Sequence, residues 1–130
     1  MSVEFDHVGI AVEDADEALK TYRDVIGMEF DYEEEFGGMR VIFLEAGEGE
    51  FELLEPLDDD GAVARHLEKR GEGIQHVAVK VDSIEDELER LEDLGIRLID
   101  DEPRPGAGGK QVAFLHPGDT HGVLLELCEY

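Results

Sequence analysis

Two ten-residue segments of the 130-residue sequence match in pattern, and this internal repeat limits the folds open to the chain. FDHVGIAVED at 5–14 is matched by IQHVAVKVDS at 74–83, with His7 aligned to His76. In both segments apolar residues alternate with other residues, which is the pattern of a half-buried strand. Two copies are too few for a solenoid, so they favour a pair of modules packed about a pseudo-twofold axis.

Each repeated strand is followed by a helical pattern and then by further strands. Asp14 and Ser83 are the expected helix caps, and Gly27 and Gly95 are the expected helix ends. The later strand-like segments are MEFDYEE, MRVIFLEAG and GEFELLEP in the first half, and IRLIDDEP, KQVAFLHPG and GVLLELCEY in the second half. Each half therefore reads strand–helix–strand–strand–strand, which predicts an α+β fold of two tandem βαβββ modules.

We predict one domain, residues 1–130, made of modules at about 3–56 and 73–130. The linker, 57–72, contains the pattern of a short helix from about Ala62 to Lys69. The two modules are expected to form a pseudo-twofold, cup-shaped sheet with the functional site between them.

Acidic side chains greatly outnumber basic ones: 35 Asp and Glu residues against 11 Lys and Arg give a net charge of −24. This charge excludes nucleic acid and anionic membranes as partners, and no apolar run is long enough to cross a bilayer. Self-repulsion of this size is relieved at high salt, where the screening length is about 3 Å at ~1 M. We therefore interpret the chain as a cytoplasmic protein of a halophilic organism; an acidic mesophilic protein is the alternative.

The sole cysteine agrees with a cytoplasmic setting. Cys128 has no second cysteine with which to form an internal disulfide, and a reducing compartment suits such a chain.

Two glutamates interrupt apolar runs at matching places in the last strand of each half. Glu52 stands in FELLEP and Glu126 in LLELCEY, and a lone buried carboxylate is costly. Together with His7 and His76 they form a candidate set of four ligands for one divalent metal ion per chain. Mixed nitrogen and oxygen donors suit Co, Mn, Ni or Zn. The alternative for each residue is burial in a purely structural role.

Four long stretches of the chain resemble a known family. They are LLEPL at 53–57, HLEKRGEGIQHVAVKVD at 66–82, IRLIDDEPRPGAGGKQVAFLHP at 96–117 and GVLLELCE at 122–129. The sequence resembles the vicinal oxygen chelate superfamily and, within it, the methylmalonyl-CoA epimerase family, over essentially its whole length. The resemblance implies a metal site built from paired βαβββ modules. It places the family's four ligands on His7, Glu52, His76 and Glu126.

The resemblance also implies an activity, the epimerisation of (R)- and (S)-methylmalonyl-CoA by α-proton abstraction and return through a metal-stabilised enolate. It assigns Glu126 as both ligand and proton carrier. Some family members have a second glutamate in a central strand, where this chain has Val41. We therefore predict Glu52 as the second acid–base group, with Glu45 or a water as alternatives. A CoA thioester is the implied small-molecule substrate, and a homodimer is the expected assembly.

Basic and glycine residues in the second half and the linker are candidates for substrate binding. The alternative for the basic ones is an ordinary role as surface charges. The candidates are Arg65, Lys69, Arg104, Gly108, Gly109, Lys110 and His116.

Other activities remain open at this point. Glyoxalase I uses a similar site of two histidines and two glutamates on a glutathione hemithioacetal. A metal-free binding protein of the same fold is a second alternative, although this chain retains all four ligand positions. An extradiol dioxygenase is disfavoured, because such iron sites use one carboxylate and leave more positions open.

Overall fold

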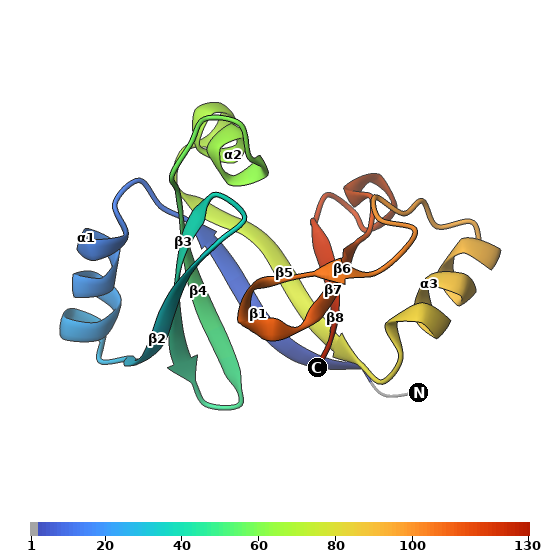
Figure 1. The fold of residues 1–130 in the computed structure, drawn as a ribbon, viewed down its shortest axis with the longest axis horizontal. Helices are drawn as coiled ribbons and strands as arrows, with labels where there is room; N and C mark the ends of the chain where they lie inside the picture. The colour runs from blue at the N-terminus through green and yellow to red at the C-terminus, as the bar shows by residue number, and fades with distance from the viewer. Residues whose placement is uncertain (1–2) are drawn as a thin grey trace. The chain divides into compact units, whose positions relative to one another are not determined.

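The computed structural model describes residues 3–130, which form two compact units. The first unit comprises residues 7–75, and the second joins residues 76–130 to the start of the chain, up to Asp6. The described residues form eight strands and a few short helices, so the predicted α+β class is confirmed (Figure 1). None of the described helices has the length and apolar character needed to span a membrane.

The first unit follows the predicted order of elements. Its sheet has the strand order β2-β3-β4-β1, with β4 parallel to β1 and the other pairs antiparallel. The elements are β1 (Val3–Ala11), α1 (Ala15–Leu19), the π-helix η1 (Lys20–Ile26), β2 (Glu29–Phe36), β3 (Met39–Ala46), β4 (Gly49–Pro56) and α2 (Ala62–Arg70). The start of β1, up to Asp6, is assigned to the second unit.

The first helix begins where the sequence predicts, because the Asp14 side chain accepts a hydrogen bond from the Glu17 backbone N–H at 3.1 Å. It ends at Gly27, whose φ of 97° is the left-handed conformation that glycine adopts without strain. Val25 and Ile26 continue the helical spacing of apolar residues in this part of the sequence, which predicts burial, but both are exposed. The last seven residues form a π-helix, so a stripe spaced for 3.6 residues per turn rotates away from the sheet.

The second unit repeats this arrangement around its own core. Its strand order is β5-β8-β7-β6, again with the last strand, β8, parallel to the first, β5. The elements are β5 (Gly73–Val81), α3 (Ile84–Asp93), β6 (Arg104–Pro105), the 3-10 helix η2 (Ala107–Gly109), β7 (Gln111–Phe114), the 3-10 helix η3 (Pro117–Asp119) and β8 (Leu125–Glu129). As predicted, the Ser83 side chain caps α3, accepting from Asp86 N–H.

One predicted strand is wrong. The segment 96–103 forms only an isolated bridge, between Leu98 and Leu115, and β6 is two residues long. The Asp100 carboxylate accepts from the Phe114 backbone N–H at 2.9 Å and pairs with Arg104 at 3.0 Å. This local side-chain bonding occupies a backbone donor that a regular strand ladder would use.

In each unit a carboxylate on the last strand accepts a hydrogen bond from the start of the helix, and the two carboxylates stand at matching places of the repeat. Glu55 on β4 accepts from the Ala15 N–H at the start of α1, at 3.2 Å. Glu129 on β8 accepts from the Ile84 N–H at the start of α3, at 2.8 Å. A carboxylate is favourable there, since the first N–H groups of a helix lack partners within the helix. The two modules are therefore equivalent in their helix anchors as well as in their strand order.

Apolar side chains on the face of the sheet that the helix covers form a separate core in each unit. In the first unit the buried cluster includes Ile10, Ile42 and Leu53, and α1 packs on it. In the second unit α3 contributes Ile84 and Leu88 to the equivalent cluster. These cores hold the strands in the register that positions the polar residues described next.

Candidate active site

His7 and Glu52 lie side by side in the first unit because β1 and β4 are parallel and in register. Glu52 is paired with Gly9, two residues after His7, so both side chains lie on one face of the sheet. Their closest atoms, His7 Nε2 and Glu52 Oε2, are 3.3 Å apart. Both residues are almost fully buried, with 1% and 3% of their surface exposed.

His76 and Glu126 form the equivalent pair in the second unit. Glu126 is paired with Ala78, again two residues after the histidine. His76 Nε2 and Glu126 Oε2 are 3.9 Å apart, and each residue is 6% exposed. The register of the repeat therefore places an imidazole beside a carboxylate in each unit, as the sequence predicts.

An aromatic ring lies next to each carboxylate. Phe43 on β3 is the register partner of Glu52, and Phe114 on β7 is the register partner of Glu126. The Phe114 ring contacts the His76 ring edge-on, with centroids 5.6 Å apart. Such apolar surroundings exclude water and fix the orientation of the imidazole.

The chemistry of each pair suits a divalent cation. A neutral imidazole nitrogen and a carboxylate oxygen are both electron-pair donors, and both are common ligands of first-row metals. Burying such donors without a cation or a proton between them is costly. The residues His7, Glu52 and His76 are accordingly candidate metal ligands, and Glu126 has the same chemistry.

The chain is similar to known proteins over most of its length. Residues 6–114 match the glyoxalase/bleomycin resistance protein/dioxygenase superfamily. The chain is 40% identical to the ethylmalonyl-CoA/methylmalonyl-CoA epimerase of Cereibacter sphaeroides, with 93% of both chains covered. It is 43% identical to the uncharacterized protein YqjC of Bacillus subtilis, covering 95% of this chain and 90% of that one.

A solved methylmalonyl-CoA epimerase in complex with methylmalonyl-CoA and NH4+ has a TM-score of 0.94 at 36% identity, covering 99% of this chain and 95% of the other. The chain belongs to the methylmalonyl-CoA epimerase family of the vicinal oxygen chelate superfamily. The resemblance expected from the sequence is confirmed.

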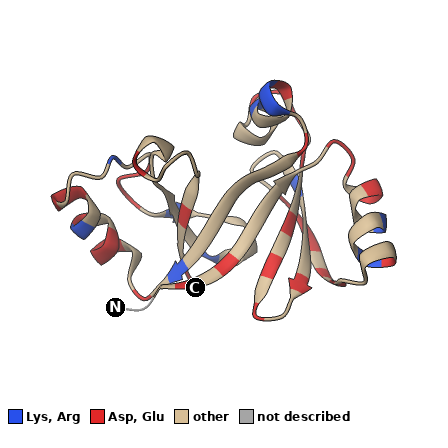
Figure 2. Ribbon diagram, turned by 180° about the vertical axis from the view of Figure 1, so that it is seen from behind, with Lys and Arg blue, Asp and Glu red and all other residues tan. Residues whose placement is uncertain are grey.

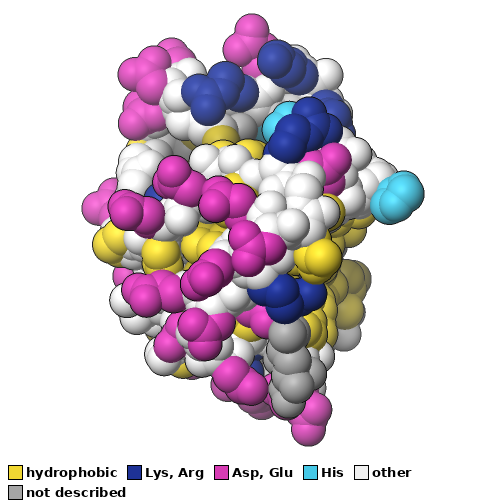
Figure 3. Space-filling view, turned by 90° about the vertical axis from the view of Figure 1, so that its right-hand side faces the viewer, with side chains coloured by type: hydrophobic (Ala, Val, Ile, Leu, Met, Phe, Trp, Pro, Cys, Tyr) yellow, Lys and Arg dark blue, Asp and Glu magenta, His cyan; other side chains and the backbone are white. Residues whose placement is uncertain are grey.

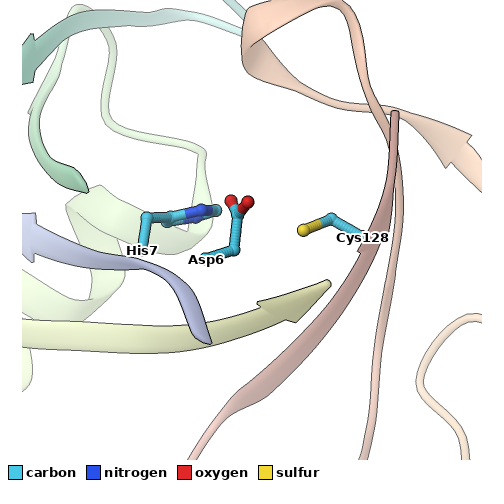
Figure 4. A group of neighbouring side chains, drawn as sticks. All are labelled: Asp6, His7 and Cys128. Atoms are coloured by element: carbon cyan, nitrogen blue, oxygen red, sulfur yellow. The ribbon is translucent and has the colours of Figure 1, made fainter. Parts of the chain in front are cut away.

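Beside this epimerase-family site, the second unit contains a buried polar cluster that sequence reasoning missed. The Lys110 ammonium is 3.3 Å from Asp6 Oδ2, and the Tyr130 hydroxyl donates to Asp6 Oδ1 at 2.6 Å. Figure 4 shows the Asp6 carboxylate facing the Cys128 sulfur, next to His7 on β1. Asp6, Lys110 and Cys128 are buried.

The cluster shifts the ionisation of two of its members. The pKa of the Cys128 thiol lies well above its usual range, first because of burial and then because of the Asp6 charge beside it. Tyr130 is largely exposed, but its hydroxyl reaches the buried Asp6, and partial desolvation of the hydroxyl together with this hydrogen bond raises the pKa of the phenol. Both groups therefore stay protonated at neutral pH, and Cys128 is not a reactive thiolate.

Lys110, predicted as a substrate contact, thus lies inside the protein and pairs with Asp6. Arg104 is exposed, pairs with Asp100, and stacks over the Phe114 ring at 5.4 Å. The Nδ1 atom of His116 accepts from the Gly118 N–H at 2.9 Å, which caps the short helix η3.

Gly108 and Gly109 have positive φ values of 82° and 76°, at the turn before β7. A side chain at either position would be strained, so the two glycines shape this loop. Arg65 and Lys69 lie elsewhere, on α2 of the first unit, where both are exposed.

Proposed function

We propose that this member of the family is a metal-dependent methylmalonyl-CoA epimerase. The observation that carries the proposal is the pair of buried His–Glu couples at equivalent positions of the repeat, His7 with Glu52 and His76 with Glu126. Relatives and solved structures that act on or bind methylmalonyl-CoA support the choice of a CoA thioester as substrate.

In this proposal His7, Glu52, His76 and Glu126 together hold one divalent ion, with Co, Mn, Ni or Zn as candidates. When bound, the ion acts as a Lewis acid that stabilises negative charge on the thioester oxygen and orients the malonyl group. The support is the donor set itself: neutral imidazoles and carboxylates, buried and held at fixed register in each unit.

The chain's own residues would move the proton. The C–H bond between the thioester and the free carboxylate breaks, its electron pair passes into the thioester carbonyl, and a glutamate carboxylate takes the proton. A second group then returns a proton to the opposite face of the same carbon. We propose Glu126 for one role and Glu52 for the other, because the repeat relates them.

The surroundings of the alternative residues favour Glu52. Val41 is a fully buried core residue and cannot carry a proton. Glu45 is exposed at the end of β3, and its pKa is raised because its protonated carboxyl can donate a hydrogen bond to the Glu29 carboxylate. Glu52 alone among these three lies beside a histidine of the site, at 3.3 Å from His7.

Exchange of the α-proton tests the reaction directly. The metal-loaded protein, incubated with (S)- or (R)-methylmalonyl-CoA in deuterated water at high salt, is expected to introduce deuterium at the α-carbon, because the removed proton mixes with solvent. Mass spectrometry of the recovered thioester measures this. Treatment with a chelator should abolish exchange, and addition of Co or Mn should restore it.

Each contrary result identifies the part of the proposal that fails. Exchange by protein shown to be metal-free would remove the ion from the mechanism and leave the epimerase activity. Absence of exchange by metal-loaded protein, together with turnover of the methylglyoxal–glutathione hemithioacetal, would assign a glyoxalase I activity. A protein that binds neither metal nor thioester substrate would be a binding protein of the same fold.

The proposal extends to a homodimer, as the family resemblance implies, and to a salt-rich cytoplasm. The support for the latter is the acidic surface: Figure 3 shows acidic side chains over much of one face, within a net charge of −24.

Raising KCl from about 0.1 M to about 2 M should increase the free energy of unfolding, because screening removes self-repulsion. Urea titrations monitored by circular dichroism measure this change. Sucrose, which does not screen charge, is the control solute, since it acts on stability only through exclusion from the surface. A stability that falls with KCl, or that rises equally in sucrose, would contradict a halophilic design.

A further inference from the structure

Most basic side chains of this acidic protein are already paired with carboxylates. The chain has eleven Lys and Arg residues, and eight of them lie within 4.0 Å of an Asp or Glu oxygen. The eight are Lys20, Arg23, Arg40, Lys80, Arg90, Arg97, Arg104 and Lys110. With so many acids available, pairing is the expected state of a base in this sequence.

Within residues 3–130, the three bases without such a carboxylate partner all lie on α2. They are Arg65, Lys69 and Arg70, on a helix of nine residues. Figure 2 shows this block of basic positions on α2, against acidic positions spread over the other elements. Lys69 and Arg70 are exposed and form the last turn of the helix.

The local acids do not neutralise this end of the helix. Arg65 Nη1 donates to the Asp60 backbone carbonyl at 2.5 Å, so its contact is with a neutral group. The Glu72 carboxylate accepts from the Glu13 backbone N–H at 2.8 Å. Glu68 directly precedes Lys69 on the helix, and side chains one or two positions apart on a helix do not face one another.

A polyanionic substrate needs a local region of positive charge on such a protein. CoA carries a diphosphate and a 3′-phosphate, and the overall charge of the chain repels them. The screening length is about 8 Å at ~0.15 M salt and about 3 Å at ~1 M, so in either medium the charges nearest a phosphate decide where it binds. A pair of exposed bases with no carboxylate partner meets this need, whereas a base already paired with a carboxylate does not.

The position of α2 connects it to the proposed reaction centre. The helix packs against β4 in the first unit, and β4 carries Glu52. We propose that Lys69 and Arg70 form the subsite that binds the phosphates of the CoA thioester. This inference rests on the proposed function, and it separates Lys69 from Arg104 and Lys110, whose charges are paired with Asp100 and Asp6.

The test compares substrates with and without phosphates. In the Lys69→Gln/Arg70→Gln variant, KM for methylmalonyl-CoA should rise about fivefold, from roughly 0.5 kcal/mol per lost exposed charge pair, with kcat unchanged. For methylmalonyl-pantetheine, which lacks the phosphates, KM should not change between variant and wild type. Dephospho-CoA thioester, an intermediate substrate, distinguishes contacts to the 3′-phosphate from contacts to the diphosphate.

A matched control removes the same charge elsewhere. The Lys20→Gln/Arg23→Gln variant loses two exposed bases of η1 that are paired with Glu17 and Asp24. It should leave KM for both substrates unchanged, which excludes an effect of net charge alone.

The competing role of Lys69 and Arg70 is to stabilise the carboxyl end of α2, where cations are favourable. That role predicts a lower melting temperature with equal KM values, and this result would overturn the subsite. An equal rise in KM for both thioesters would also overturn it. If the wild-type protein epimerises neither thioester, the proposed function fails. If it epimerises both, the KM values of variant and wild type test only the phosphate subsite.

Discussion

Replacing Glu126 with glutamine is expected to lower the rate of α-proton exchange by about a thousandfold, within the range that positioned acid–base groups contribute. A glutamine keeps the shape of the side chain and an oxygen that can face a cation, but it cannot accept the proton. Because the metal ligands are otherwise retained, KM should change much less than kcat. Deuterium incorporation under single-turnover conditions, with metal content measured on the same sample, checks both expectations.

Glu129→Gln is the matched control for this variant. Glu129 lies on the same strand, three residues further on, and accepts from the Ile84 N–H at the start of α3. The substitution makes the same change of charge, and the amide oxygen can still accept that bond. Activity should stay close to wild type. If Glu126→Gln retains wild-type exchange with its metal bound, Glu126 is a ligand or a structural residue and not a proton carrier.

Replacing Lys110 with methionine is expected to lower the free energy of unfolding by about 3 kcal/mol, because it leaves a buried carboxylate without its cation. Lys110 and Asp6 are 4% and 8% exposed, and their contact is 3.3 Å long. The Tyr130 hydroxyl would still donate its hydrogen bond to Asp6, which reduces the loss of stability. Urea unfolding at fixed high salt, with equal slopes for both proteins, measures the difference.

A second variant and a control distinguish a buried charge from lost packing. The double variant Asp6→Asn/Lys110→Met should recover most of the stability, since it removes both charges. Lys80→Met is the exposed counterpart: Lys80 also lies over the Tyr130 ring and pairs with Glu4, but both partners are open to solvent. Its loss should be below about 1 kcal/mol. Equal losses for Lys80→Met and Lys110→Met would contradict the assignment.

The repeat made both His–Glu pairs predictable from the sequence. A histidine in each first strand and a glutamate in each last strand stand at matching places, and a βαβββ module brings its first and last strands together. The structural roles of Glu55 and Glu129 could have been predicted in the same way, because the two residues stand at matching places of the repeat. Each accepts a hydrogen bond from a backbone N–H at the start of a helix. The repeat is informative because a polar residue that interrupts an apolar strand in one half has a counterpart at the matching place in the other half.

The Asp6–Lys110–Tyr130 cluster could not be found in this way, because it has no counterpart in the first unit's sequence. Asp6 directly precedes His7, and strict alternation along a strand would turn one of the two toward solvent. Both are buried. Likewise, the strand pattern of 96–103 gave no sign that Asp100 would bond to Phe114 N–H, since that contact depends on a residue from another strand.

The parallel pairing of β1 with β4, and of β5 with β8, has a consequence for the order of events in synthesis. Parallel neighbours require a long crossover between them, so each imidazole meets its carboxylate only after a helix and two strands have been placed. Contacts between residues so distant along the chain form late, after the cost of closing the loop has been met. A nascent or partly folded polypeptide therefore presents scattered donors, and the proposed metal site would become complete only after both crossovers had formed.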